Sequence, residues 1–171
     1  PDLNSYPQNK LKNAMHPAYQ ELVVKEVIEY SADVKTFVLS KKDGSALAYP
    51  QAGNYLSIKL EIGDAKLCRP YSLSSSPKEA LEGKYTLTIK RVKDGLASNY
   101  ILDNFKVGTE VMASAPLGQF TYEPLRDAKT VIGIAGGSGI TPFFSLAKAI
   151  KDGTEDFSLI LLYGSRTKSD I

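Results

Sequence analysis

The sequence predicts an all-β region of barrel or sandwich class followed by a single βαβ unit, and two observations lead to this prediction. Short segments rich in β-branched and aromatic residues alternate with turns that contain Gly, Pro or Asp. After Arg126 this pattern gives way to an apolar run, a helical segment and a second apolar run. We therefore expect an N-terminal arm over residues 1–19, a β domain over 20–126 and an incomplete α/β unit over 127–171.

The arm is polar and contains two prolines, which is typical of a loose connector. Strands of the β domain are expected over residues 21–30, 34–40, 54–62, 84–92 and 108–116, with a further strand starting near Arg69 and a short helix over 96–105. In the α/β unit the expected elements are buried-type strands over 129–137 and 157–165 and a helix over 142–153 that ends at a glycine.

Composition narrows the classes of protein to consider. The chain has 171 residues, 43% of them hydrophobic, so it can bury a core. Lys and Arg number 21 against 19 Asp and Glu, without a dense basic run, so we expect no nucleic-acid partner. Neither a signal peptide nor a long apolar run is visible, so we expect a cytoplasmic protein without a membrane span.

The single cysteine and the single histidine are not expected to carry chemistry. Cys68 cannot form an internal disulfide, and one thiol cannot hold an iron–sulfur cluster within these residues. We expect Cys68 to be a small strand residue that faces the core. His16 lies in the arm, so we expect neither a catalytic nor a metal-binding role, and no metal site overall.

The stretch "RPYSLSSSP" begins with Arg69 and Tyr71 and has two interpretations. In an ordinary strand, the arginine would be a solvated edge charge and the tyrosine a cross-strand packing residue. The alternative is a ligand site. It depends on whether other segments of the chain are suited to the same ligand.

The turn "GIAGGSGITPF" is one such segment. Its glycines permit close approach of a ligand to the backbone, and the helix that follows presents free N–H groups to an anion such as phosphate. Pro142 suits the first turn of that helix. The turn is neither a Walker loop nor the usual Rossmann fingerprint, since proline stands where the third glycine would be. A tight strand-to-helix turn without a ligand would have the same pattern.

The segment "IKRVKDGLASNY" is a second candidate phosphate site. Lys90 and Arg91 end a strand, Gly95 turns the chain, and the residues after it open a short helix. Backbone amides and a hydroxyl near basic side chains would suit a pyrophosphate. A solvated basic strand end with a Ser or Asn helix cap is the alternative.

Taken in order, "RPYSLSSSP", "TIKR", "GLASNY", "APLG" and "AGGSGITPF" resemble the motif series of the ferredoxin–NADP reductase superfamily, from about Glu21 to Ile171. The resemblance implies a six-stranded Greek-key antiparallel β-barrel that holds FAD, followed by a partial α/β nucleotide-binding domain for NAD(P)H. Only 45 residues follow Arg126, enough for one βαβ unit. We therefore expect a hydrophobic edge and face without a cover, and a chain that is part of a longer reductase.

By the same resemblance, Arg69 would bind the phosphate side of the flavin, and Tyr71 would pack along its ring and ribityl chain. Ser72 would be the catalytic residue, with its hydroxyl near N5, the atom that accepts the hydride. These residue types suit the roles, since a guanidinium pairs bidentately with phosphate and an aromatic ring stacks on a flat cofactor. The residues implied to line the rest of the flavin and its pyrophosphate are Ile89, Lys90, Gly95, Leu96, Ala97 and Ser98.

The resemblance also assigns residues to the nucleotide side. Ser138 would stand near the flavin, where the two domains meet. Gly137, Gly139 and Thr141 would approach the nicotinamide nucleotide. Arg166, in "YGSR", would reach the phosphates of the nucleotide, with a solvated arginine as the alternative.

The expected function is that of a flavin-dependent oxidoreductase. It would pass a hydride from NAD(P)H to FAD and electrons onward to an attached iron–sulfur domain or another one-electron acceptor protein. Two alternatives stay open. One is an electron-transfer subunit of a larger flavoenzyme complex of the dihydroorotate dehydrogenase type, and the other is a non-catalytic docking module that retains the barrel. FMN is the alternative flavin.

Overall fold

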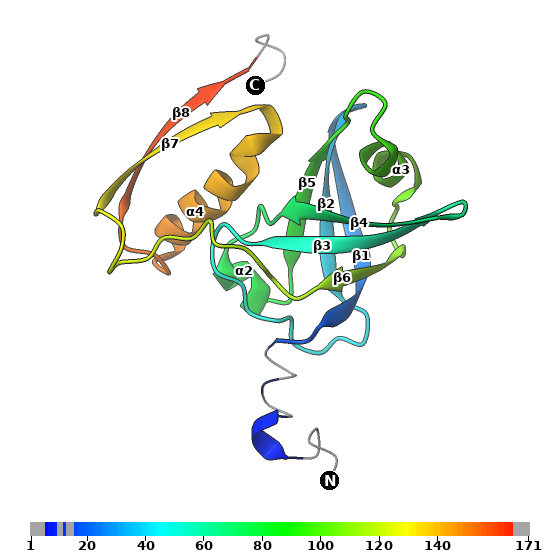
Figure 1. Ribbon diagram of the computed structural model, residues 1–171, viewed down its shortest axis with the longest axis horizontal. Helices are drawn as coiled ribbons and strands as arrows, with labels where there is room; N and C mark the ends of the chain where they lie inside the picture. Colours follow the sequence, from blue (N-terminus) through cyan, green and yellow to red (C-terminus); the bar gives the residue numbers. More distant parts are fainter. Residues whose placement is uncertain (1–5, 10–11, 13–15, 166–171) are drawn as a thin grey trace.

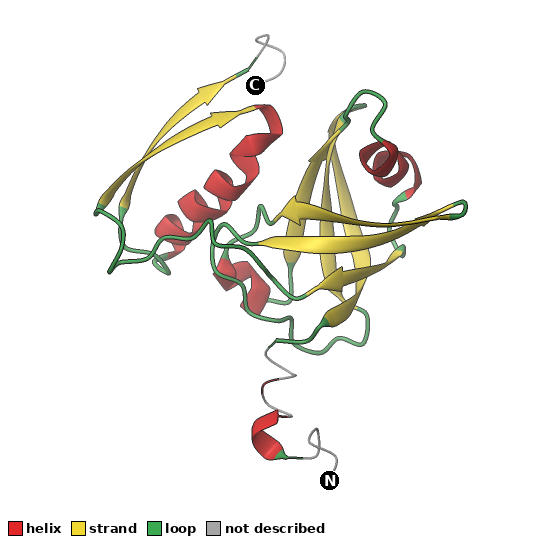
Figure 2. Ribbon diagram, viewed as in Figure 1, coloured by secondary structure: helices red, strands yellow, loops and turns green. Residues whose placement is uncertain are grey.

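The computed structural model describes residues 6–9, 12 and 16–165. Six antiparallel strands come first and an α/β unit follows, so the predicted fold class is confirmed (Figure 1, Figure 2). The strands of the first part are β1 (Tyr19–Ser31), β2 (Val34–Lys41), β3 (Tyr55–Ile62), β4 (Ala65–Ser72), β5 (Tyr85–Lys90) and β6 (Glu110–Ser114). Two helices, α2 (Pro77–Leu81) and α3 (Leu96–Asn104), lie between strands of this part.

The six strands form one curled sheet in the order β4-β3-β6-β1-β2-β5. Its two edge strands approach each other just past the end of β4, where Leu73 forms a bridge with Leu87 and the Ser74 N–H donates to the carbonyl of Thr86 at 2.9 Å. This closure makes a barrel, so the sandwich alternative is wrong. Alternate strand residues point inward and form the core, among them Leu22, Phe37, Leu39, Leu56, Ile58 and Tyr85.

Tyr85 is fully buried in the barrel, and its hydroxyl donates to the carbonyl of Ala48. Burial raises the pKa of the phenol to about 12. An unfolded tyrosine ionises near pH 10, so the unfolded chain loses this proton first. The contribution of Tyr85 to stability is thus complete below pH 10 and is lost between about pH 10 and 12, at roughly 1 kcal/mol per pH unit.

Tyr85→Phe is therefore expected to remove part of the alkaline loss of stability. The measurement is the free energy of unfolding by denaturant at several pH values from 8 to 11.5, for the wild type and the variant. All other groups are the same in the two proteins, so their contributions cancel in the difference. Parallel curves for the two proteins would contradict the prediction.

The α/β unit consists of β7 (Thr130–Gly136), the 3-10 turn η2 (Gly137–Gly139), α4 (Ile140–Asp152) and β8 (Ser158–Gly164). The two strands pair in parallel, and Figure 1 shows α4 between them and the barrel. The helix ends at Gly153, whose φ of 75° is left-handed, so the predicted glycine stop is confirmed.

The prediction that β7 and β8 are buried-type strands is wrong. Ile134 is 77% exposed and Ile132 is 65% exposed, because α4 covers one face of the pair and no described element covers the other. Parallel strands need a layer on each face to become buried on both. The expectation of an uncovered hydrophobic face is confirmed for the described part of the chain.

The prediction that Cys68 faces the core is also wrong, since its side chain is exposed. Successive residues of a strand point to opposite faces. Leu67 and Tyr71 of β4 pack against the barrel core, which places Cys68 on the opposite side.

Helix α2 was not among the predicted elements. Ser76 caps it by accepting from the N–H of Glu79, and the Glu79 carboxylate accepts from the N–H of Ser76 at 2.7 Å. This reciprocal pair is a capping box, and Pro77 stands at the first helical position. The sequence "SPKE" was the signal that could have revealed the helix.

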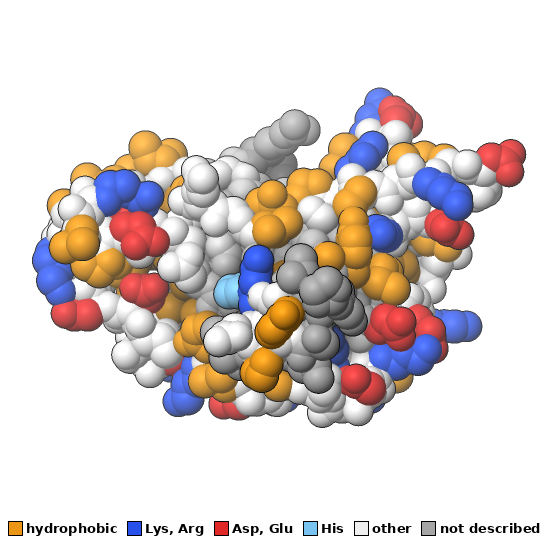
Figure 3. All heavy atoms as spheres, turned by 60° about the horizontal axis from the view of Figure 1, so that its bottom comes forward, with side chains coloured by type: hydrophobic (Ala, Val, Ile, Leu, Met, Phe, Trp, Pro, Cys, Tyr) orange, Lys and Arg blue, Asp and Glu red, His pale blue; other side chains and the backbone are white. Residues whose placement is uncertain are grey.

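Surface charge is mixed. On the face displayed in Figure 3, acidic and basic side chains lie interspersed rather than in a field of one sign. In the described residues, no helix has the length and apolar character needed to cross a membrane.

Candidate functional site

A cavity of about 590 Å³ lies where the barrel meets the α/β unit. Its walls come from β4, β5, the beginning of α3 and the turn that leads into α4. The predicted site residues that line it are Arg69, Tyr71, Ser72, Ile89, Lys90, Gly95, Leu96, Ala97, Ser98, Ser138, Gly139 and Thr141. Gly137 borders two adjoining hollows, and Arg166 lies outside the described residues.

The fold explains why segments so far apart in sequence meet here. Closure of the barrel brings β4 beside β5, and α3 begins soon after β5 ends. The α/β unit packs onto this end of the barrel, with the first turn of α4 at the cavity. Pro70, Thr88, Val92 and Pro142 also line the cavity and were not predicted as site residues.

Arg69 is a positively charged residue in the lining of this cavity. Its side chain is exposed, and its Nη1 donates to the carbonyl of Cys68 at 2.9 Å. Among the described residues, no carboxylate lies within salt-bridge distance of this guanidinium. The neighbouring Tyr71 is half-buried, and burial raises the pKa of its phenol, an effect that Arg69 opposes. The pair therefore presents a cation beside a neutral aromatic ring.

The serines of "RPYSLSSSP" divide into two kinds. Ser74, Ser75 and Ser76 are buried, and each hydroxyl bonds within the protein: to Thr86 and Thr88, to the N–H of Thr86, and to Asp152 respectively. Ser72 lines the cavity, and its hydroxyl has no hydrogen-bond partner in the part of the chain described. Of the four, Ser72 is the one whose hydroxyl is available to a ligand.

Of the two basic residues predicted at the end of β5, one lines the cavity and the other does not. Lys90 lines the cavity. Arg91 does not, because its guanidinium bonds Asp103 at 2.7 Å and Asp33 at 3.0 Å, and the hydrogen bond to Asp103 raises its pKa. Arg91 thus ties α3 to the turn between β1 and β2, and it lines an adjoining hollow instead of this cavity.

The beginning of α3 presents main-chain rather than side-chain groups. The hydroxyl of Ser98 accepts from the N–H of Val92 at 3.2 Å, so it belongs to the turn. Gly95 is required by the same turn, because a Cβ there would lie 2.8 Å from Ser98 Oγ and 2.9 Å from Val92 Cβ. The first N–H groups of a helix have no acceptor within the helix, so they remain for an anion. The side chain of Ile89 is in the barrel core, so we expect a ligand to meet chiefly its main chain.

The glycine turn before α4 leaves space on the cavity side. Gly137 has a φ of 52°, which favours glycine, and its carbonyl accepts from the hydroxyl of Tyr163 at 3.2 Å. Gly139 has an ordinary helical backbone, and a Cβ added there would meet no atom of the described residues within 4 Å. Packing of the chain therefore does not explain Gly139, whereas close approach of a ligand would. The hydroxyl of Thr141 donates to the carbonyl of Ser138 at 3.0 Å and holds the turn in shape.

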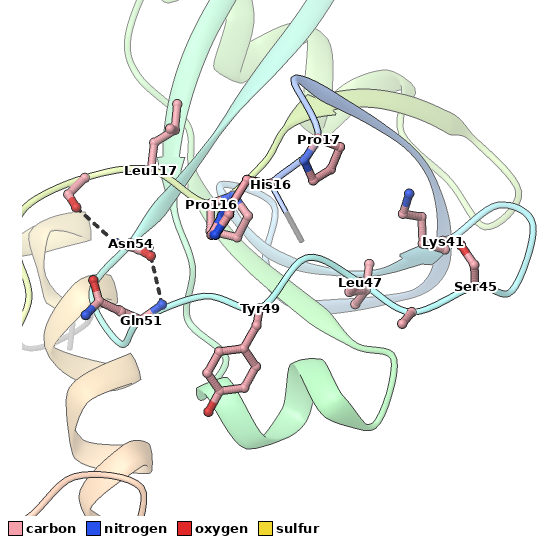
Figure 4. A pocket seen from close by; sticks show the side chains of 12 residues that line it. His16, Pro17, Lys41, Ser45, Leu47, Tyr49, Gln51, Asn54, Pro116 and Leu117 are labelled. Atoms are coloured by element: carbon pink, nitrogen blue, oxygen red, sulfur yellow. Dashed lines mark hydrogen bonds between the residues drawn. The ribbon is translucent and has the colours of Figure 1, made fainter. Parts of the chain in front are cut away.

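A second cavity, of about 830 Å³, lies between the end of the arm and the barrel loops (Figure 4). It contains His16 but none of the predicted site residues. Asn54 braces its wall by accepting from the N–H of Gln51 at 2.8 Å and donating to the carbonyl of Gly118 at 3.2 Å. Across the described residues, no three His, Cys, Asp or Glu side chains are placed to hold a metal ion. The candidate site is therefore the first cavity.

Family models match almost the whole chain after the arm. The oxidoreductase FAD-binding domain matches residues 21–122, and the oxidoreductase NAD-binding domain matches residues 134–171. The chain belongs to the ferredoxin–NADP reductase superfamily. The predicted resemblance is thereby confirmed, and the cavity lies between the FAD-binding part and the NAD-binding part of this superfamily member.

Two relatives show how much of a superfamily protein is present. The chain is 32% identical over 146 residues to the glycine betaine monooxygenase reductase subunit of Chromohalobacter salexigens, covering 85% of this chain and 39% of that protein. It is 31% identical over 166 residues to NADH-cytochrome b5 reductase 1 of Dictyostelium discoideum, covering 95% of this chain and 56% of that protein. The chain thus spans about two fifths to just over half of these relatives.

Solved structures give the same result. The FAD/NAD binding domain of a nitric oxide dioxygenase from Vibrio cholerae matches with a TM-score of 0.75 at 31% identity, over 88% of this chain and 64% of that one. Phthalate dioxygenase reductase matches with a TM-score of 0.75 at 27% identity, over 87% of this chain and 44% of that one. Its structure is described as modular, for electron transfer from pyridine nucleotides to [2Fe-2S].

Proposed function

We propose that this chain is the flavin-binding part, and the start of the nucleotide-binding part, of an NAD(P)H-dependent FAD oxidoreductase. The observation that carries the proposal is the cavity between the two parts, which gathers the candidate residues of the β-barrel and of the glycine turn. A cofactor in this cavity would contact both parts at once.

The chemistry of the lining fits a flavin dinucleotide. Arg69 supplies a guanidinium for phosphate, Tyr71 a flat ring to lie along the flavin, and the first turn of α3 main-chain N–H groups for the pyrophosphate. When bound, FAD supplies the redox chemistry, since it accepts a hydride and can release the two electrons one at a time.

On the nucleotide side, the space at Gly139 would admit the nicotinamide nucleotide, and the turn held by Thr141 would present the first turn of α4 to it. Ser72 would hydrogen-bond near the atom that receives the hydride. Among the described residues that line the cavity there is no carboxylate and no histidine. The work of this chain is therefore to bind and orient the two cofactors.

The onward acceptor would be an attached iron–sulfur domain or another one-electron carrier protein. The names of the relatives support this, since they include a monooxygenase reductase subunit and a reductase for electron transfer to [2Fe-2S]. We place the protein in the cytoplasm, as the sequence suggested, and expect it to act without a membrane span.

The intact protein is expected to purify with FAD bound and to lose its visible flavin absorbance when NAD(P)H is added without oxygen. The cofactor is identified by denaturing the protein and separating the released flavin by chromatography, with FAD and FMN as standards. Release of FMN would overturn the choice of FAD. Absence of any flavin would favour the docking-module alternative.

A further inference from the structure

Helix α4 carries a polar stripe on the side that faces the barrel. We define the α4 polar stripe as Thr141, Ser145, Lys148 and Asp152, whose spacing of four, three and four residues places them on one face of the helix. Three of the four bond residues of the barrel part. Polar contacts thus join the two parts along this face.

Ser145 is the most buried member of the stripe, with 1% of its surface exposed. Its hydroxyl donates to the carbonyl of Ser75 at 2.7 Å and accepts from the N–H of Gly53 at 3.3 Å. Ser75 follows β4 and Gly53 precedes β3, so one hydroxyl ties α4 to two loops of the barrel. Both of its hydrogen-bonding roles are used within the protein.

The other contacts of the stripe lie nearer the C-terminal end of α4, farther from the cavity. Lys148 Nζ bonds both carboxylate oxygens of Glu79, at 2.9 and 3.0 Å, and the Ser76 hydroxyl donates to Asp152 at 2.5 Å. The Lys148 and Glu79 side chains remain 29% and 26% exposed, so water competes for this ion pair.

Ser145 connects the two walls of the cavity through α4 on one side and the loop after β4 on the other. It is one helical turn, about 6 Å along the axis, from Thr141, and its partner Ser75 is three residues from Ser72. Directional hydrogen bonds between buried groups allow few alternative arrangements, whereas apolar contacts tolerate sliding. The position of the α4 turn relative to β4 therefore depends on this hydroxyl.

We propose that Ser145 is a positioning residue for hydride transfer. It sets the placement of the nicotinamide-side turn against the flavin-side strand, without touching either cofactor, since it does not line the cavity. This inference rests on the proposed function. A displacement of about 1 Å between reacting groups is enough to slow a reaction about a hundredfold.

The test is Ser145→Ala in the intact protein. We expect unchanged flavin content and an unchanged flavin spectrum, but a limiting rate of anaerobic flavin reduction by NAD(P)H that falls about 10- to 100-fold. Hydrogen–deuterium exchange, measured without NAD(P)H, gives a second readout. Peptides that cover residues 50–54 and α4 should exchange faster, while peptides of β1 and β2 stay as in the wild type.

Thr154→Val is the matched control. It also removes a hydroxyl bond of α4, from Thr154 to the carbonyl of Ala149 at 3.1 Å, but one confined to the α/β unit. It should keep the wild-type limiting rate even if the melting temperature falls. If Ser145→Ala does not accumulate as folded protein, Ser145→Cys replaces it, because a thiol is close in size and a weak hydrogen-bonding group.

A flavin-loaded Ser145 variant that is reduced at the wild-type limiting rate would overturn the inference while leaving the proposed function intact. So would equal slowing in Thr154→Val, which would indicate a general loss of stability. A wild-type protein without flavin would instead overturn the proposed function. The exchange measurement would then decide separately whether Ser145 fixes the position of α4.

Discussion

Replacing Arg69 with alanine is expected to raise the dissociation constant for FAD about 10- to 150-fold, the equivalent of one charge-assisted hydrogen bond of roughly 1.5–3 kcal/mol. Arg69 lines the cavity, and no carboxylate of the described residues neutralises it. Its charge is therefore available to a phosphate, which would compete only with the carbonyl of Cys68 that Nη1 now contacts. Arg69→Lys should recover only part of the affinity, because an ammonium cannot form the bidentate pair.

The measurement is a fluorescence titration of the flavin-free protein with FAD at fixed ionic strength. Lys66→Ala is the matched control, since Lys66 lies on the same strand, its side chain is 84% exposed, and its loss removes the same charge. It should bind FAD as the wild type does. If Arg69→Ala binds FAD with wild-type affinity, Arg69 is a solvated edge charge.

Ser72→Ala is expected to retain flavin but to lower the limiting rate of flavin reduction about 10- to 100-fold, with little change in nucleotide affinity. The Ser72 hydroxyl borders the cavity without a hydrogen-bond partner in the described part of the chain, so its loss leaves no internal group unsatisfied. The measurement is stopped-flow flavin reduction at varied NAD(P)H in the intact protein.

Two comparisons sharpen this test. Ser74→Ala removes a hydroxyl that bonds Thr86 and Thr88 inside the barrel, so it should lower stability and spare the rate. Thr141→Ala should mainly raise the KM for NAD(P)H and leave the flavin spectrum unchanged, because it loosens the turn that receives the nucleotide. A Ser72→Ala protein that reduces its flavin at the wild-type limiting rate would exclude the assignment of Ser72 beside N5.

The features that the sequence predicted most accurately are those that depend on residues close together in the chain. Five of the six barrel strands, the helix α3 and the glycine stop after α4 lie where the pattern placed them, within the usual uncertainty at element ends. The exception is β4, which begins at Ala65, before the start expected near Arg69. Alternation of apolar residues, turn residues and helix stops act over a few positions, so they can be read along the chain. The motifs that carry the family resemblance are local in the same sense.

Other features of the fold depended on partners that are distant in sequence. For Arg91 the sequence left two interpretations open, a phosphate partner and a solvated strand end, and the fold pairs its guanidinium with Asp33 and Asp103. The apolar composition of β7 and β8 predicted buried-type strands, and only the short length of chain after Arg126 indicated an uncovered face, because an apolar strand has the same composition whether or not a second layer covers it. Neither outcome leaves a trace in the local sequence.

The sequence by itself determined the order of the elements, the superfamily and the residue types that suit a flavin and a nucleotide. Only the tertiary structure decided which of these residues share one cavity and which serve the fold. Ser72 lines the cavity, whereas the carbonyl of Ser75 accepts a hydrogen bond from Ser145 of α4, where the α/β unit packs on the barrel. The reason is physical: a hydroxyl's role depends on which donors and acceptors the folded chain brings within about 3 Å of it, and those come from segments far away in sequence.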